Sequence, residues 1–296
     1  MIKYEKLTRR KYHKVLYLEI IENFMQAHTA IKIAKFRYII YRIYLRIFMG
    51  KRKRDLFIKE KKIWYFHFLP LFYGNRILKS HEGFKAVPRL MTDDFSLLFF
   101  EREEEIKEHF KMNPGETFVD IGANVGYYSL LIAKENPDMK IISIEAHPDN
   151  FAAMNKNFEV NNFKNIISLN KAITSESGGK VRLYEHWLES GIKNTGTFNI
   201  SNKYNSKSFV EVNCDTLDNL LKFLSNTTYV IKIDIEGEEA NALLGAKDTL
   251  KSTRKIIVEI HNDDSFQNVK EILLFYKFNV EVVKSKMTFL IGTRHT

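Results

Sequence analysis

The chain has 296 residues, and 45% of them are hydrophobic, which is enough for a packed core and excludes a wholly disordered protein. Its single cysteine, Cys214, excludes an internal disulfide framework and a cysteine-built zinc site. The net charge of +10 is uneven, because residues 1–80 hold 20 Lys and Arg against 5 Asp and Glu while the remainder is net acidic.

Residues 1–80 form a basic N-terminal region in which apolar residues recur at helical spacing. Residues 31–48 show this best, since four basic residues share one side of a helical wheel and apolar residues occupy the other. Charges interrupt the stretch too often for a membrane-spanning helix, and residues 1–10 lack the apolar core of a secretory signal. We therefore predict a cytoplasmic location.

Three roles are open for this basic region. The amphipathic stretch and the basic cluster at residues 51–54 fit a peripheral helix on an anionic membrane, at its inner face. Apolar residues within 64–72 favour instead a helical region that docks onto the rest of the chain. RNA binding is the third role, although no recognisable nucleic-acid module accompanies the charge.

Residues 81–114 are predicted to connect this region to a domain that spans residues 115–296. The connection contains a predicted helix over residues 94–110, with Thr92 or Asp93 as its N-cap.

Short strands rich in Ile and Val alternate with helical segments from residue 117 onward. Predicted strands cover residues 117–121, 140–145, 165–172, 230–235 and 255–260, with shorter pieces at 181–184 and 209–214. Predicted helices cover residues 125–134, 148–160, 238–250 and 266–276. A short connection between strands at 279–283 and 288–291 indicates an antiparallel hairpin. The pattern predicts an α/β fold, doubly wound around a mostly parallel sheet.

A glycine-bearing turn follows the first of these strands, in the sequence F-V-D-I-G-A-N-V-G at residues 118–126. In an open parallel sheet such a turn lies at the carboxyl end of the strand, where ligands bind. Dinucleotide sites carry G-x-G-x-x-G, but Asn124 stands where the second glycine would be. The turn therefore predicts a nucleotide-like ligand other than a dinucleotide.

Acidic residues end two later strands. Glu145 ends the next strand, where a carboxylate can accept hydrogen bonds from both ribose hydroxyls. Asp234 and Glu236 follow a later strand and are expected at the same sheet edge. We interpret Glu238 and Glu239 as ordinary charges at a helix N-terminus.

Several segments together resemble the FkbM-type family of S-adenosylmethionine-dependent methyltransferases. They are F-V-D-I-G-A-N-V-G-Y-Y-S at residues 118–129, I-E-A-H-P at 144–148, N-K-A at 170–172, V-N-C-D-T-L-D at 212–218, I-K-I-D-I-E-G at 231–237 and V-E-I-H at 258–261. Their order and spacing are specific, and the resemblance covers about the last three-fifths of the chain without explaining the basic region.

The resemblance implies a Rossmann-like sheet of seven strands with an antiparallel last strand, and S-adenosyl-L-methionine as the methyl donor. It implies a methionine-side wall built from Asp120, Gly122, Asn124 and Gly126. Glu145 would bind the ribose, Ala172 would lie near the adenine, and Asp234 would lie beside the methyl group. The implied acceptor is a hydroxyl of a saccharide, a glycolipid or another small metabolite.

A base that removes the hydroxyl proton would assist the transfer. Candidates at the right sheet edge are His261, Glu236, Asp234 and Glu259, and we favour His261 because imidazole titrates near neutral pH. The alternative is a loop histidine beside Asp263 or Asp264. Acidic residues here could also hold magnesium, but such groups occur by chance in a charged protein, so we predict no metal.

Three other functions remain to be compared with methyl transfer to a small molecule. A nicotinamide-dependent reductase is disfavoured by the missing G-x-G-x-x-G. A catalytically silent binding module is disfavoured by the intact turn at residues 120–126, although a fold never establishes activity. A nucleic-acid methyltransferase would use the basic region, but D-I-E-G stands where amino-methylating enzymes carry an N-P-P-Y-like segment. Nucleic acid is therefore not the expected partner.

Overall fold

The computed structural model describes residues 75–99, 103–187, 193–224 and 227–294. The predictions for the basic region, at residues 31–48, 51–54 and 64–72, lie outside the described residues. Within the described ranges, no helix has the length and apolar character needed to cross a membrane.

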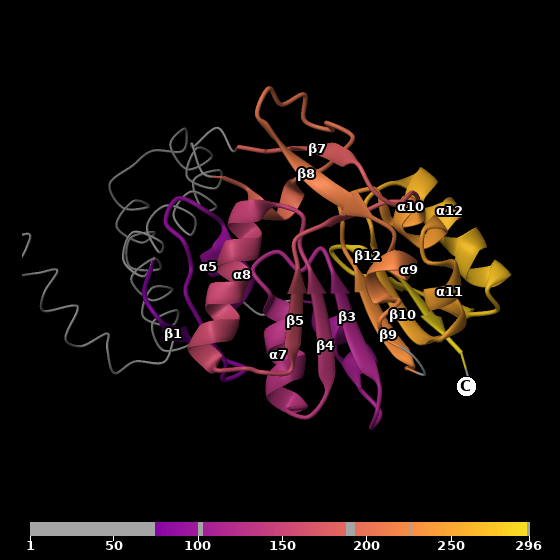
Figure 1. Cartoon of the computed structure of the whole chain (residues 1–296), viewed down its shortest axis with the longest axis horizontal. Helices are drawn as coiled ribbons and strands as arrows, with labels where there is room; N and C mark the ends of the chain where they lie inside the picture. The colour runs from indigo at the N-terminus through magenta and orange to yellow at the C-terminus, as the bar shows by residue number, and fades with distance from the viewer. Residues whose placement is uncertain (1–74, 100–102, 188–192, 225–226, 295–296) are drawn as a thin grey trace, which may run out of the picture.

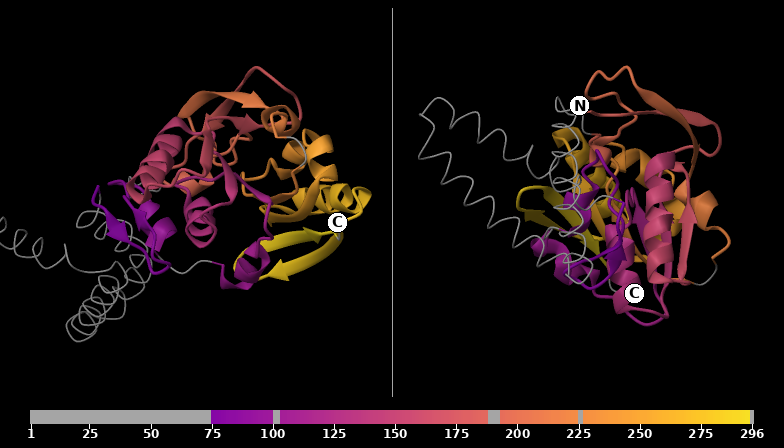
Figure 2. Two further views of the ribbon diagram at one scale, coloured as in Figure 1. Left: turned by 60° about the horizontal axis from the view of Figure 1, so that its bottom comes forward. Right: turned by 90° about the vertical axis from the view of Figure 1, so that its left-hand side faces the viewer.

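A seven-stranded sheet forms the centre of the fold (Figure 1). Its order is β11 (Asn279–Lys284), β12 (Thr288–Thr293), β10 (Thr253–Ile260), β9 (Tyr229–Ile233), β3 (Thr117–Ile121), β4 (Lys140–Ile144) and β5 (Ile166–Leu169). Strands β10 to β5 are parallel, and β12 is antiparallel to both of its neighbours. The hairpin of β11 and β12 lies at one edge, in yellow in Figure 2. The predicted sheet of seven strands with an antiparallel last strand is confirmed.

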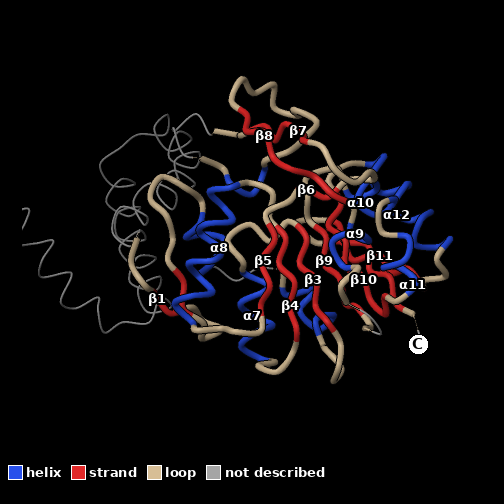
Figure 3. Tube along the Cα trace, in the orientation of Figure 1, coloured by secondary structure: helices blue, strands red, loops and turns tan. Residues whose placement is uncertain are grey.

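Alternate residues of the strands face opposite layers of helices, as the period of a strand requires. In β3, Phe118 belongs to one core and Val119 to the other. The first core is shared with α5 (Asp94–Phe99), α6 (Glu104–Lys107), the 3-10 helix η2 (Glu108–Phe110), α7 (Tyr127–Glu135) and α8 (Pro148–Asn161). The second is shared with α9 (Leu217–Leu221), α10 (Glu239–Leu244), α11 (Lys247–Lys251) and α12 (Asp263–Phe275). Figure 3 shows the helices on both sides of the sheet, which confirms the doubly wound α/β architecture.

A second sheet of three strands lies above the central strands in the view of Figure 1. Its order is β6 (Ala172–Ile173), β8 (Phe209–Asp215) and β7 (Lys180–Tyr184), and it has its own small apolar core. The chain between β7 and β8 includes the 3-10 helix η3 (Thr195–Thr197), which reaches back toward the main sheet. A short hairpin, β1 (Leu78–Lys79) with β2 (Lys85–Ala86), precedes α5.

Three predicted elements are divided in the structure. The strand expected over 165–172 ends at Leu169, because Asn170 turns away and donates to the carbonyls of Glu145 and Ala146, and β6 then joins the second sheet. The helix expected over 238–250 is interrupted after α10, at Gly245. The helix expected over 94–110 is also divided, since α6 starts after Glu103, whose φ of 44° is left-handed.

Candidate active site

A cavity of about 300 Å³ lies at the carboxyl ends of β3, β4 and β9, which is large enough for a small ligand. Its wall brings together most of the residues predicted from the sequence, namely Asp120, Gly122, Asn124, Glu145, Ala172, Asp234 and Glu236. The structure places Gly126 and His261 outside this wall. Residues of the segment 194–200 close the cavity from the side of the second sheet.

The turn after β3 takes its shape from left-handed backbone conformations. Gly122 has a φ of 75°, and a Cβ there would lie 1.8 Å from the carbonyl oxygen of Asp234, so only glycine fits. Asn124, with a φ of 52°, adopts the conformation that asparagine tolerates better than most residues. Gly126 is the N-cap of α7. A Cβ there would lie 2.7 Å from the ring of Phe158, so this glycine accommodates a neighbouring side chain and not a ligand.

Glu145 is held from two sides at the end of β4. Its Oε2 accepts a 2.8 Å hydrogen bond from the backbone N–H of Asn124, and its Oε1 accepts one of 2.8 Å from that of His147. The side chain of Asn150 also hydrogen-bonds to this carboxylate, which leaves one of its lone pairs for a ligand hydroxyl. Burial raises the pKa of Glu145 to about 7, against the effect of these hydrogen bonds.

Only one of the two carboxylate oxygens of Asp120 accepts hydrogen bonds from the described residues. Oδ2 accepts hydrogen bonds from the backbone N–H and the hydroxyl of Ser129, at 3.2 and 2.7 Å. Oδ1 is buried and has no hydrogen-bond partner among the described residues. Burial raises the pKa of Asp120, although the charge of Lys232 opposes this. A buried acceptor without a partner in a ligand-sized cavity is suited to a cationic group on the ligand.

Lys232, in the segment I-K-I-D-I-E-G, lines the cavity although its position in the sequence predicted no role for it. Its side chain is 3% exposed, its Nζ lies 3.1 Å from Oδ2 of Asp234, and it also lies 4.8 Å from the ring centroid of Tyr128. Burial disfavours the ammonium ion, but the charges of Asp234 and Asp120 outweigh burial and raise the pKa of Lys232. The side chain is therefore a fixed cation between two predicted site carboxylates.

His261 lies behind the acidic wall of the cavity. Its Nε2 is 3.6 Å from Asp234 Oδ1, 3.5 Å from Glu236 Oε1 and 3.6 Å from Glu259 Oε1. Its Nδ1 lies 2.9 Å from Oε1 of Glu239. Burial disfavours the imidazolium ion, but Glu236, Glu239 and the charge of Asp234 outweigh burial and raise the pKa of His261 to about 11. His261 is thus a cation in the ligand-free protein, and its alternative partners Asp263 and Asp264 are exposed in the first turn of α12.

Glu239 corrects one interpretation made from the sequence. It was interpreted as an ordinary charge at a helix N-terminus, and it does lie in the first turn of α10, but its side chain has no exposed surface. Besides His261, it accepts hydrogen bonds from the backbone N–H of Gly237 and the hydroxyl of Ser265, at 2.8 and 2.6 Å. Sequence position could not reveal this role, because two of the partners, His261 after β10 and Ser265 in α12, are distant along the chain.

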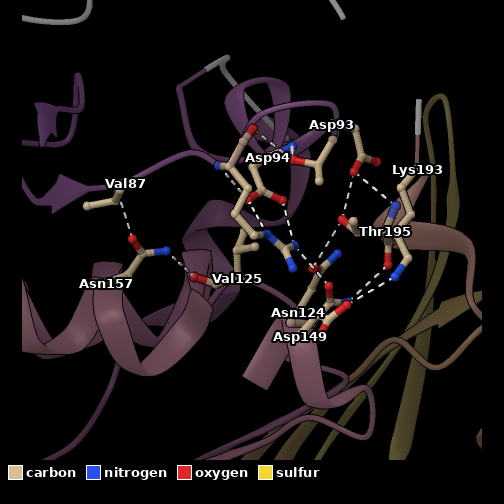
Figure 4. Close-up of polar contacts among 12 residues, drawn as sticks. Val87, Asp93, Asp94, Asn124, Val125, Asp149, Asn157, Lys193 and Thr195 are labelled. Carbon is tan, nitrogen blue, oxygen red and sulfur yellow. Dashed lines mark hydrogen bonds and ion pairs between the residues drawn. The ribbon is translucent and has the colours of Figure 1, made fainter. Parts of the chain in front are cut away.

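The segment 193–198 is hydrogen-bonded to the residue that precedes α5, as Figure 4 shows. Asp93, which with Thr92 was an N-cap candidate, directly precedes α5, and its side chain accepts hydrogen bonds from the N–H and the hydroxyl of Thr195, at 2.9 and 2.6 Å. The hydroxyl of Thr195 also lies 3.4 Å from the side-chain oxygen of Asn124. An exposed ion pair of Lys193 with Asp149 also connects the segment to α8. Residues before 115 therefore help to build the cavity.

A family model described as methyltransferase FkbM domain matches residues 120–282. The hexuronic acid methyltransferase AglP of Haloferax volcanii is 26% identical over 177 residues, which cover 59% of this chain and 69% of that protein. Methyltransferase 1 of Beauveria bassiana is 24% identical over 241 residues, which cover 69% of this chain and 97% of that protein.

The precorrin-6y C5,15-methyltransferase of Geobacter metallireducens is similar among solved structures. Its TM-score is 0.42 at 12% identity, over 66% of this chain and 90% of that chain.

Proposed function

The chain belongs to the methyltransferase FkbM domain family, and from this we propose that it transfers a methyl group from S-adenosyl-L-methionine to a hydroxyl of a saccharide, a glycolipid or another small metabolite. The observation that carries the proposal is the convergence of the glycine turn, Glu145 and an acidic cluster on one cavity.

The residues at one end of the cavity fit each part of the proposed donor. Glu145 offers its remaining lone pair to a ribose hydroxyl. Oδ1 of Asp120 offers an acceptor to the methionine ammonium group. The apolar side chains of Ala172, Ile173 and Leu183 line the same cavity and suit the adenine ring.

The other end of the cavity would receive the acceptor hydroxyl. S-Adenosylmethionine supplies an activated methyl group, so the chain itself has to orient the hydroxyl and accept its proton. Glu236 lines the cavity, whereas His261 lies behind it and carries a proton at neutral pH. We therefore assign the base to Glu236 and give His261 the role of a positioning residue, because Nε2 of His261 lies 3.5 Å from Oε1 of Glu236.

Strain at Glu236 supports a role in the reaction. Its φ of 55° is left-handed, which costs a residue with a Cβ about 1–2 kcal/mol, and such strain is frequent at functional sites.

A saccharide acceptor is favoured by the charges around the cavity. The acceptor end is acidic, with Glu103, Asp234, Glu236, Glu238 and Glu259 on its wall. These carboxylates would repel the phosphates of a nucleic acid. The relative named as a hexuronic acid methyltransferase also supports a sugar acceptor.

Labelled donor tests the proposal directly. The full chain is incubated with methyl-labelled S-adenosylmethionine and with separated saccharide, lipid and nucleic-acid fractions of a cell extract. We expect alkali-stable label in the saccharide or glycolipid fraction, as an ether would give. Label confined to RNA bases would contradict the proposed acceptor.

A further inference from the structure

The side chains behind the cavity wall have the arrangement of a metal site. One ligand atom each of Asp234, Glu259 and His261 lies within 4.8 Å of the other two. Nε2 of His261 is 3.6 Å from Oδ1 of Asp234 and 3.6 Å from Oε1 of Glu259. Two ligands that are each about 2.1 Å from a metal lie about 3.0–3.4 Å apart, so these two distances are within a few tenths of an ångström of coordination.

Among the described residues, two buried atoms of these side chains have no hydrogen-bond partner. They are Nε2 of His261 and Oε2 of Glu259, whose side chains are 4% and 6% exposed. Buried polar atoms are almost always satisfied, so two together indicate an absent ligand. We infer that Asp234, Glu259 and His261 bind one divalent cation at the acceptor end of the cavity. The cation would displace the proton on Nε2 of His261, because only the neutral imidazole coordinates a metal.

The surrounding residues orient the three ligands. Glu239 accepts from Nδ1 of His261, which leaves Nε2 as the nitrogen facing the two carboxylates, and a carboxylate partner of this kind is typical of metal-bound histidines. Glu239 is itself fixed by Gly237 and Ser265. Lys232 occupies Oδ2 of Asp234 and leaves Oδ1 on the side of His261.

The three proposed ligands differ from an ordinary ion-pair cluster, in which a lysine ammonium group bridges the carboxylates. A comparable trio, His147 with Asp149 and Glu185, shows the difference. There the ammonium of Lys193 already lies 2.5 Å from Glu185 and 3.2 Å from Asp149. A lysine fills that position, whereas in the described part of the chain Glu259 and His261 have no lysine among their ion-pair partners.

One imidazole and two carboxylates suit Mn²⁺ better than purely oxygen-seeking Mg²⁺ or sulfur-seeking metals. The use of the metal rests on the proposed function, because Glu259 and Asp234 line the cavity where the acceptor hydroxyl would bind. A cation at this place would hold that hydroxyl and lower its pKa, beside the base Glu236. The binding site itself depends only on the contacts above.

Titration of the chelator-treated full chain with Mn²⁺ tests the inference, with free Mn²⁺ followed by electron paramagnetic resonance. We expect one saturable site per chain, and a Glu259→Gln variant that binds at least about 10-fold more weakly. Glu259→Gln should fold, because it removes a crowded buried charge, and His261→Gln is a second variant. The control Glu211→Gln alters an exposed acid paired with Arg182 and should bind as the wild type.

Absence of saturable Mn²⁺ binding at millimolar concentration, or unchanged binding by both Glu259→Gln and His261→Gln, would overturn the inference. Binding of S-adenosylhomocysteine is measured on the same samples. A wild-type chain that binds S-adenosylhomocysteine but not Mn²⁺ would refute the metal site and leave the proposed function standing. A wild-type chain that binds Mn²⁺ but not S-adenosylhomocysteine would do the reverse.

Discussion

The backbone N–H of Asn124 donates a 2.8 Å hydrogen bond to Oε2 of Glu145, which joins the turn after β3 to the end of β4. The two residues were predicted separately from the sequence as parts of one ligand site. Their contact shows that the site is formed before a ligand binds, because the carboxylate is already oriented by the turn. Preorganisation of this kind lowers the entropy cost of binding.

The pKa of Glu145 predicts a pH-dependent affinity for S-adenosylhomocysteine. Ribose hydroxyls favour the ionised carboxylate, so the pKa in the complex must lie below the value of about 7 in the free protein. Affinity should therefore be full above about pH 8 and fall as the pH drops through 7. Calorimetric titrations at several pH values measure this.

The Glu145→Gln variant is the control for that dependence. It should bind S-adenosylhomocysteine weakly, with an affinity that changes little between pH 6 and 8 (about one unit on either side of the Glu145 pKa). A wild-type affinity that rises toward low pH would contradict the assigned role.

Asp120→Asn should separate stability from ligand binding. The substitution removes a buried charge whose pKa is already raised by burial, and the amide oxygen can still accept from Ser129. The amide N–H₂ would then replace the unengaged Oδ1 and repel the ammonium group of the ligand. We expect an unchanged or higher Tm with at least about 10-fold weaker S-adenosylhomocysteine binding. A variant that binds as the wild type would remove Asp120 from the site.

Asp93→Ala should loosen the segment that closes the cavity. The buried carboxylate makes two hydrogen bonds to Thr195, so its loss leaves both donors unsatisfied, at a cost of about 1–3 kcal/mol. Faster hydrogen exchange in residues 193–198 and weaker ligand binding are expected. Asp149→Ala is the matched control, because it removes only the exposed ion pair of Lys193, worth about 0–1 kcal/mol. Equal effects of the two variants would contradict this account.

Glu236→Gln should lower turnover by about 10²-fold in the labelled-donor assay, with S-adenosylhomocysteine affinity nearly unchanged, because a general base acts on the acceptor proton alone. Glu211→Gln serves as the exposed control. Full activity of Glu236→Gln would transfer the role of the base to another group, of which Glu259 lines the same cavity.

The features that could be predicted from the sequence are those fixed by neighbours along the chain. Strand and helix order follow from local apolar patterns, and the turn of Gly122 and Asn124 follows from residues that tolerate left-handed conformations. These local signals were sufficient for the sheet and for most of the cavity wall.

Features that depend on contacts between distant segments could not be predicted. Asp93 and Thr195 are 102 positions apart, and nothing local distinguishes Asp93 from an N-cap. Glu239 similarly looks like a helix N-terminal charge until His261 is placed beside it. Burial of the side chains, not their identity, decides these roles.

Calorimetric titration of the full chain with S-adenosylhomocysteine, and separately with NAD, tests the central claim most directly. The turn at residues 120–126 with Glu145 predicts saturable 1:1 binding of S-adenosylhomocysteine in the micromolar range, about −8 kcal/mol, and no binding of NAD. Binding of NAD without binding of S-adenosylhomocysteine would contradict the assignment of this cavity to a methyl donor.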